Sequence, residues 1–162
     1  MIAIRPERPQ DVAAIRAVVG AALGAAEADL VEALRRDGDL ILSLVAIDGE
    51  PVGHVAFCRL ACDAPLRATG LAPLTVRPDR QRQGIGTALV GDGLRRLAEA
   101  GEDLVLVLGD PATYGRFGFS RAAAERLRTP YDGPALQGLA LTARGRAAAG
   151  PVRYPAAFAG LS

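Results

Sequence analysis

Residues 74–89 read Leu-Thr-Val-Arg-Pro-Asp-Arg-Gln-Arg-Gln-Gly-Ile-Gly-Thr-Ala-Leu, which predicts a strand, a basic turn and a helix in succession. Residues 74–76 favour a strand, and Pro78 and Asp79 end the run. From Ile85 the apolar residues recur at helical spacing, so we expect the helix to begin near Gly84. Its first backbone N–H groups have no partner within the helix and carry the positive end of the helix dipole. The stretch therefore predicts a site for a phosphate or pyrophosphate.

Two common nucleotide motifs fit this stretch poorly. A dinucleotide-binding fingerprint needs a third glycine where Leu89 stands, and a Gly-Lys-Ser/Thr loop needs a lysine, which the chain lacks. A glycine-rich turn without a ligand is the plain alternative. A nucleotide-binding regulator is the weaker hypothesis, because it explains the glycines and leaves a second motif at residues 109–119 unexplained.

Length and composition are those of one domain. The chain has 162 residues, half of them apolar, and a net charge of +1, so we expect a single domain over residues 1–162 with no broad basic surface for nucleic acid. No run reaches the roughly 20 apolar residues of a transmembrane helix, and the N-terminus lacks a signal-peptide pattern. These features predict a cytoplasmic protein that binds neither nucleic acid nor membrane.

The chain's single histidine, His54, is followed by Cys58 and Cys62 at spacings of four, which would share one face of a helix and suggest a metal site. However, an Asp48-Gly49 turn precedes them and indicates the second strand of a hairpin. Residues four apart on a strand lie about 13 Å apart, too far for one ion. We therefore expect no metal and two reduced thiols.

The order of predicted elements is that of a mixed α/β sheet. Strands are predicted at residues 1–5, 41–47, 52–60, 71–76, 104–108, 117–119 and 136–141, with a hairpin turn at 48–51 and a turn at 131–134. Helices are predicted at residues 10–23, 27–36, 84–98 and 111–116. The connecting helix makes strands 71–76 and 104–108 parallel. Pro73 predicts a bulge or an unpaired position, and Gly91 and Gly93 predict close packing of the helix on the sheet.

Two motifs carry a resemblance to a known family. Gln81, Gly84 and Gly86 match the Gln/Arg-x-x-Gly-x-Gly/Ala signature, and Tyr114 to Phe119 resembles the Tyr-x-x-x-Gly-Phe motif, of the GNAT superfamily of N-acetyltransferases. With the hairpin before them, the resemblance covers roughly residues 1–121. The Gly-Asp-Pro sequence at residues 109–111 and the tail at residues 152–155 resemble those of an uncharacterised bacterial subgroup of this family. The resemblance implies the GNAT fold, in which strands four and five, here 71–76 and 104–108, splay apart.

The resemblance also implies a function and a site. It implies transfer of the acetyl group of acetyl-CoA, as co-substrate, to a primary amine by direct attack in a ternary complex. The backbone of Leu74, Thr75 and Val76 would pair with the pantetheine arm, the Val76 amide would donate to the oxyanion, and Tyr114 would act as general acid. The pyrophosphate would lie on the residues at the helix start, which are Gln81, Arg82, Gln83, Gly84, Ile85, Gly86 and Thr87. Arg80 and Arg82 are candidates for charge-assisted contacts.

The general base, the acceptor and the oligomeric state stay open. Residues 68–76 hold no carboxylate, so the candidates for the base are His54, Glu27, Glu32 and Asp63, or a water chain to solvent. Asp110 is expected to cap the helix after it. The missing carboxylate also keeps open a non-catalytic acyl-CoA-binding or sensor module of the same fold. The resemblance implies a small-molecule or peptide amine as acceptor, and the C-terminal tail is a candidate contact in a homodimer.

Overall fold

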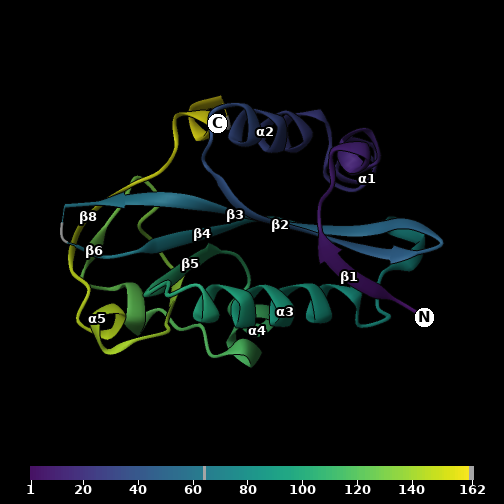
Figure 1. The fold of residues 1–162 in the computed structure, drawn as a ribbon. Helices are drawn as coiled ribbons and strands as arrows, with labels where there is room; N and C mark the ends of the chain where they lie inside the picture. The colour runs from purple at the N-terminus through teal and green to yellow at the C-terminus, as the bar shows by residue number, and fades with distance from the viewer. Residues whose placement is uncertain (64, 161–162) are drawn as a thin grey trace.

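The computed structural model describes residues 1–63 and 65–160, in which a mixed sheet lies between two layers of helices (Figure 1). The strands are β1 (Ala3–Pro6), β2 (Leu40–Asp48), β3 (Glu50–Cys62), β4 (Ala68–Val76), β5 (Leu104–Leu108), β6 (Leu127–Arg128), β7 (Leu136–Ala140) and β8 (Gly150–Arg153). The helices are α1 (Val12–Leu23), α2 (Ala25–Arg36), α3 (Ile85–Glu99), α4 (Pro111–Tyr114) and α5 (Ala143–Arg146). The strand order is β1-β2-β3-β4-β5-β7, and β8 pairs with β3 and β6.

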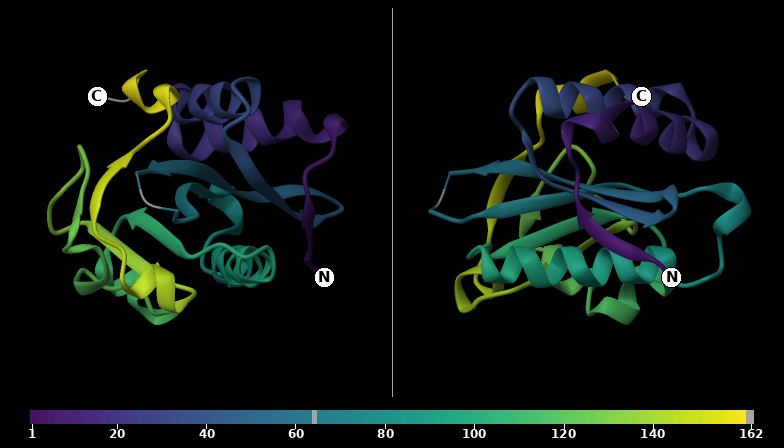
Figure 2. Two further views of the ribbon diagram at one scale, coloured as in Figure 1. Left: turned by 60° about the vertical axis from the view of Figure 1, so that its left-hand side comes forward. Right: turned by 45° about the vertical axis from the view of Figure 1, so that its right-hand side comes forward.

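Helices α1 and α2 cover one face of the sheet, and α3 and α4 lie on the other (Figure 1). The apolar faces of these helices form the hydrophobic core on both sides of the sheet. Val19 of α1 and Leu34 of α2 are buried on one side of the sheet. On the other side, Leu89 of α3 is buried in one cluster with Phe57 of β3. The C-terminal segment, including the 3-10 turn Ala156–Gly160, returns over the edge of the sheet and ends beside α2 (Figure 2). In the described ranges, no helix has the length and apolar character that crossing a membrane requires.

Strand β4 changes its pairing halfway along its length. It runs parallel to β5 from the pair Ala68↔Leu104 to the pair Leu71↔Val107, where the pairing stops. Against β3, the pair Phe57↔Leu71 is followed by Val55↔Leu74, so residues 72–73 together oppose one residue of β3. This bulge contains Pro73, as predicted. Residues 72–76 therefore leave one edge of β4 free, which confirms the splay expected between strands 71–76 and 104–108.

A buried carboxylate fixes the position of residues 68–71 of β4, the half that pairs with β5 (the paired half). Glu102, 1% exposed, accepts hydrogen bonds from Arg59 of β3 at 2.6 and 2.9 Å, from Arg67 at 2.9 Å and from Thr69 of β4 at 2.7 Å. Burial raises the pKa of Glu102, but the bonds from Arg59, Thr69 and Arg67 together lower the pKa below its usual value. The carboxylate is therefore charged at neutral pH and ties the start of β4 to β3 and β5.

Close packing of α3 on the sheet was predicted at Gly91 and Gly93, and the structure confirms it at Gly93 only. A Cβ on Gly93 would overlap the ring of Phe57, so the helix approaches the sheet closely there, as predicted. Gly91 is exposed, and a Cβ built on it meets nothing within 4 Å. The prediction of close packing is therefore wrong for Gly91, because this residue faces away from the sheet.

The region after α4 differs most from the sequence-based prediction. Residues 117–119 were expected to form a strand, but a 3-10 turn covers Gly115–Phe117, and Gly118 adopts a left-handed conformation with φ of 100°. That conformation breaks an extended run, and Ser120 retains a single bridge to Gly138 of β7. Strands β6 and β8 and helix α5, each two to four residues long, were not predicted, because such short elements carry no periodic pattern. The turn predicted at residues 131–134 lies in a region of turns and bends.

Candidate functional site

A cavity of about 620 Å³ lies where the start of α3 faces the segment after β5 and residues 72–76 of β4, which we call the splayed half. It is lined by Leu74, Val76, Gln81, Arg82, Gly84, Ile85, Gly86, Thr87, Thr113, Arg116 and Phe117. Eight of these residues were predicted from the sequence as cofactor-binding. Three other predicted residues do not line it: Thr75 faces the opposite side of the sheet, Gln83 is exposed and accepts a hydrogen bond from Arg80, and Tyr114 lies beside the lining residues.

The backbone at the start of α3 offers donors to this cavity. The first hydrogen bond of the helix runs from Ala88 N–H to the Gly84 carbonyl at 3.0 Å, so the N–H groups of residues 85–87 have no acceptor within the helix. Gly84 caps the helix with φ of 83°, and Arg82 adopts a positive φ of 64°, so the turn before the helix is tightly wound. Donors at the positive end of a helix of this length favour a phosphate or pyrophosphate.

The arginines near the helix start differ in what they contact. Arg80 donates to Asp48 at 2.8 Å and to Gln83, and it does not line the cavity. The expectation that Arg80 faces the anion therefore finds no support in this geometry. Arg82 lines the cavity and has no hydrogen bond to another described residue. Arg116 also lines it, with its guanidinium 5.5 Å from the ring centre of Phe117. Among the described residues, Arg82 and Arg116 are therefore the positive charges facing this cavity.

The splayed half of β4 presents free backbone groups toward the same cavity. Arg77 N–H donates to the Val52 carbonyl of β3 at 2.8 Å. N–H directions alternate along a strand, so the N–H groups of Leu74 and Val76 point to the edge that β5 leaves free. The side chains of these two residues line the cavity. This edge can therefore accept an extended ligand as an added strand would.

Tyr114, predicted as general acid, lies at the end of α4. A Cβ on Gly109 would overlap the Tyr114 ring, and this ring meets Phe119 edge to face at 5.9 Å between centroids. Burial raises the pKa of Tyr114, so its hydroxyl is protonated at neutral pH. Asp110 accepts from Ala112 N–H at 3.0 Å and caps α4, as expected.

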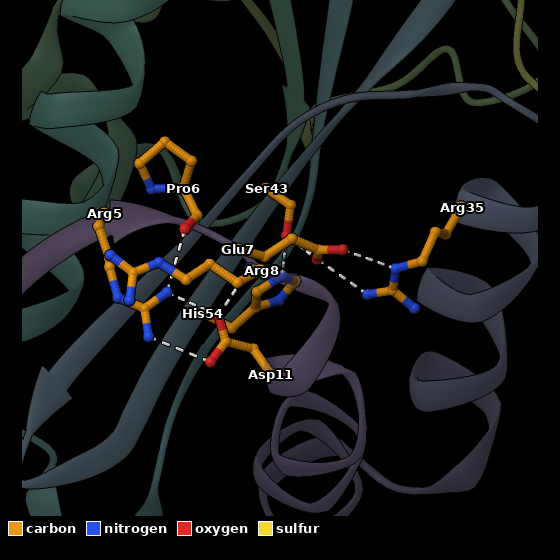
Figure 3. A network of polar contacts seen from close by, with 8 residues as sticks. All are labelled: Arg5, Pro6, Glu7, Arg8, Asp11, Arg35, Ser43 and His54. Carbon is orange, nitrogen blue, oxygen red and sulfur yellow. Dashed lines mark hydrogen bonds and ion pairs between the residues drawn. The ribbon is translucent and has the colours of Figure 1, made fainter.

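The candidates for the general base lie away from the cavity. His54 of β3 is fully buried, and its Nε2 lies 2.7 Å from the Ser43 hydroxyl (Figure 3). Burial lowers the pKa of His54 to about 4. Glu32 pairs with Arg16 at 3.1 Å, and Asp63 pairs with Arg153 at 2.9 Å at the surface. Glu27, at the start of α2, is half-buried.

Cys58 and Cys62 lie on β3 with His54, as the strand prediction required, and both are free thiols. Burial raises the pKa of Cys58 to about 12, so it is a neutral core thiol. In residues 1–63 and 65–160, no three His, Cys, Asp or Glu side chains are grouped closely enough to hold a metal ion.

The sequence-based prediction missed Thr113, Arg116 and Phe117, which all line the cavity. All three lie close to Tyr114 within the motif at residues 109–119, so this motif could have identified them as cavity residues. The sequence pattern predicts a strand at Phe117, whereas its place in a 3-10 turn directs it toward the cavity.

Comparisons with known proteins agree with this architecture. A profile of the acetyltransferase (GNAT) family matches residues 11–119. The uncharacterized N-acetyltransferase YhbS of Escherichia coli K12 is 43% identical over 134 residues, which cover 80% of each chain. The uncharacterized N-acetyltransferase YjhQ of the same organism is 38% identical over 133 residues, covering 76% of this chain and 73% of that protein.

Two solved structures match nearly the whole chain. The crystal structure of E. coli YhbS in complex with CoA superposes with a TM-score of 0.92 at 39% identity, over 99% of this chain and 93% of that one. A GNAT family acetyltransferase from Brucella melitensis, in complex with acetyl-CoA, superposes with a TM-score of 0.84 at 38% identity, over 98% of both chains. Because the family profile spans more than half of the chain and the relatives are this similar, the protein belongs to the GNAT family of acetyltransferases.

Proposed function

We propose that the protein transfers the acetyl group of acetyl-CoA to a primary amine by direct attack within a ternary complex. One observation carries this proposal: the free amides at the start of α3 and the free edge of β4 converge on a single cavity. The CoA and acetyl-CoA complexes of the two structural relatives support it. The acceptor is a small-molecule or peptide amine.

Binding relies mainly on backbone groups. The N–H groups of residues 85–87 would hold the pyrophosphate, with Arg82 and Arg116 adding charge at the rim of the cavity. The edge of β4 at Leu74, Thr75 and Val76 would hold the pantetheine arm through main-chain hydrogen bonds. This arrangement relies on the backbone of a glycine-opened helix and uses no lysine, a residue that the chain lacks.

Two groups of the chain would then act on the thioester. The Val76 N–H would donate to the carbonyl oxygen as negative charge builds on it, a contribution of about 3 kcal/mol for a preorganised donor. The Tyr114 hydroxyl, which burial keeps protonated, would give its proton to the departing thiolate. Since the amine attacks directly, neither cysteine is needed as a nucleophile.

The proposal is tested by calorimetric titration with acetyl-CoA of the wild type and of Gly86→Glu. A Cβ at Gly86 meets Leu74 and Val76 only at 3.7 Å, so the variant can fold while its carboxylate enters the cavity. We expect its affinity to fall at least about 100-fold, or about 3 kcal/mol. Gly91→Glu is the matched control, because it makes the same change on an exposed face of α3 and should leave the affinity unchanged.

A wild type that shows no binding at millimolar acetyl-CoA would contradict the proposal. The non-catalytic alternative is motivated by the lack of a carboxylate on β4 and is separated by thiol release. Binding without release of CoA in the presence of primary amines would favour an acyl-CoA-binding or sensor module. The free thiols of Cys58 and Cys62 suit a reducing compartment such as the cytoplasm, where acetyl transfer would take place.

A further inference from the structure

A line of polar groups runs from the surface of α2 to the buried face of β3 (Figure 3). Arg35 donates to the Glu7 carboxylate at 2.7 and 2.9 Å. The Ser43 hydroxyl of β2 donates to the same carboxylate, and the Ser43 oxygen lies 2.7 Å from His54 Nε2. The four residues come from the segment after β1, from α2, from β2 and from β3, so the fold assembles them.

The hydrogen bonds of this line determine which nitrogen of His54 carries the proton. Burial raises the pKa of Glu7, but its bonds from Arg35 and Ser43 together lower the pKa, so the carboxylate is ionised and can only accept. Ser43 has one hydroxyl proton and gives it to Glu7. Its oxygen must then accept from His54 Nε2–H. A neutral imidazole has one N–H, so Nδ1 carries a free lone pair.

The free Nδ1 points to a second unpartnered group. His54 is 0% exposed and Thr75 is 1% exposed, and neither His54 Nδ1 nor Thr75 Oγ1 has a hydrogen-bond partner among the described residues. The two residues are directly opposite on β3 and β4, so their Cβ atoms lie about 5 Å apart on one face of the sheet. Buried polar atoms in proteins nearly always have a partner. Because these two neighbouring groups both lack a partner, the Thr75 hydroxyl can give its proton to the free lone pair of His54 Nδ1.

This pair lies on the face of the sheet that α1 and α2 cover, opposite the cofactor cavity. Thr75 immediately precedes Val76, whose N–H points to the free edge of β4. At the other end of the line, Glu7 is 17% exposed in its side chain and borders an open pocket together with Arg35 and Ser43. A proton received at Thr75 therefore has a continuous set of groups leading to solvent.

We propose that His54, positioned by Ser43 and Glu7, accepts through the Thr75 hydroxyl the proton lost by an amine that reaches the free edge of β4 from the α1–α2 face of the sheet. This inference rests on the proposed function. The amine nitrogen bonds to the acetyl carbon as the carbon–sulfur bond breaks. Its proton passes to Thr75 Oγ1, whose own proton passes to His54 Nδ1. The Nε2 proton then moves to Ser43, and the Ser43 proton moves through Glu7 to solvent. The departing thiolate separately receives the Tyr114 proton, and solvent then returns a proton to the Tyr114 oxygen.

The charged groups that act on the imidazole are Glu7 and Arg35. Burial has the largest effect and disfavours the imidazolium, the Glu7 carboxylate favours it, and the Arg35 guanidinium disfavours it. The ring is therefore neutral and able to accept a proton at pH 7. Glu7 offsets part of the cost when the ring becomes charged, which is the role of the carboxylate in a positioned histidine base.

The test uses hydroxylamine as a small acceptor, saturating acetyl-CoA, and formation of acetohydroxamate as the measured rate. We expect His54→Gln to lower kcat/KM for hydroxylamine about 100-fold while the Kd for acetyl-CoA stays unchanged. Cys58→Ala is the matched control, because Cys58 lies four residues along the same strand and is equally buried. It should keep the wild-type rate.

A second measurement separates a proton acceptor from a structural residue. His54 is the only histidine, so its ring nitrogens give a single set of signals in nitrogen NMR. We expect the Nε2–H tautomer. We also expect the rate, expressed per concentration of unprotonated hydroxylamine, to fall at low pH with the same midpoint as the NMR titration. Ser43→Ala removes the acceptor for Nε2–H, which should lower both midpoints together and reduce the rate about 10-fold.

The outcomes distinguish this inference from the proposed function. A folded His54→Gln protein with the wild-type rate, or a rate midpoint that stays fixed in Ser43→Ala while the NMR midpoint moves, would overturn the relay and leave acetyl transfer intact. A wild type that binds acetyl-CoA but does not accelerate acetohydroxamate formation would overturn the transfer and the relay together. Loss of acetyl-CoA binding in the wild type would instead contradict the cofactor site.

Discussion

In residues 68–71, β4 forms hydrogen bonds with strands on both sides, whereas in residues 72–76 β3 is its only partner among the described strands. The first half contains Thr69, whose hydroxyl donates to the buried Glu102 carboxylate. The second half contains Thr75, whose hydroxyl has no partner among the described residues. Both threonines are almost completely buried, at 0% and 1% exposure.

The difference shows how one strand can serve stability and binding at the same time. Buried polar groups that are fully hydrogen-bonded fix a structure, and buried polar groups without partners cost free energy. The bulge at Pro73 separates the two situations within nine residues. We infer that the paired half carries the stability of the sheet, and that the splayed half keeps its backbone edge available for ligands and leaves the buried Thr75 hydroxyl without a partner among the described residues.

The largest expected effect comes from breaking the paired half with Glu102→Ala. Removing this carboxylate leaves Arg59, Arg67 and Thr69 without their acceptor. Both arginines are partly exposed and can be solvated, so we expect the low end of the range for a broken buried ion pair, about 3 kcal/mol of lost unfolding free energy. Denaturant titration measures this loss, and calorimetry should show an unchanged Kd for acetyl-CoA.

The control is Glu99→Ala, which removes an exposed glutamate that pairs with Arg95 at 3.0 Å on α3. It should cost about 0.5 kcal/mol or less, because surface ion pairs contribute little. A Glu102→Ala protein that keeps full stability, or that weakens acetyl-CoA binding strongly, would show that the two halves of β4 do not divide these tasks.

The sequence predicts the splayed half of β4 better than the paired half, for a physical reason. The anion site depends on neighbours in sequence, namely the strand end, the turn and the glycines at 84 and 86, so local pattern sufficed. The Glu102 cluster joins residues up to 43 positions apart, and no local pattern reports such a contact. The Ser43–His54 bond joins two strands across a hairpin and depends on their register, which the sequence left open.

A smaller effect is expected from the pH dependence of stability, which probes the splayed half through His54. In the unfolded chain this histidine binds a proton below its usual pKa of 6.5, whereas burial lowers the pKa in the folded protein to about 4. The unfolded state therefore binds more protons between these values, and stability falls as pH decreases. Between pH 6.5 and 5 we expect a loss of about 2 kcal/mol in the free energy of unfolding.

His54→Gln should remove most of that slope when unfolding is followed by denaturant titration at several pH values. Glu7 does not interfere in this window, because its lowered pKa places the loss of its contribution below its usual value of 4.5. An unchanged slope in the variant would mean that His54 is already solvated in the folded protein. That result would contradict its burial beneath α1 and α2.

The smallest expected effect gives the sharpest comparison, because it makes the same change in each half of β4. Thr69→Val removes a 2.7 Å hydrogen bond to a buried carboxylate, which keeps its bonds from Arg59, so unfolding free energy should fall by about 1.5 kcal/mol. Thr75→Val removes a buried hydroxyl without a partner, so stability should rise by about 1 kcal/mol. The two effects have opposite sign although shape and burial match. If Thr75→Val instead destabilised the protein as much as Thr69→Val, then its hydroxyl would be satisfied in the free protein, and the splayed half would be as fully bonded as the paired half.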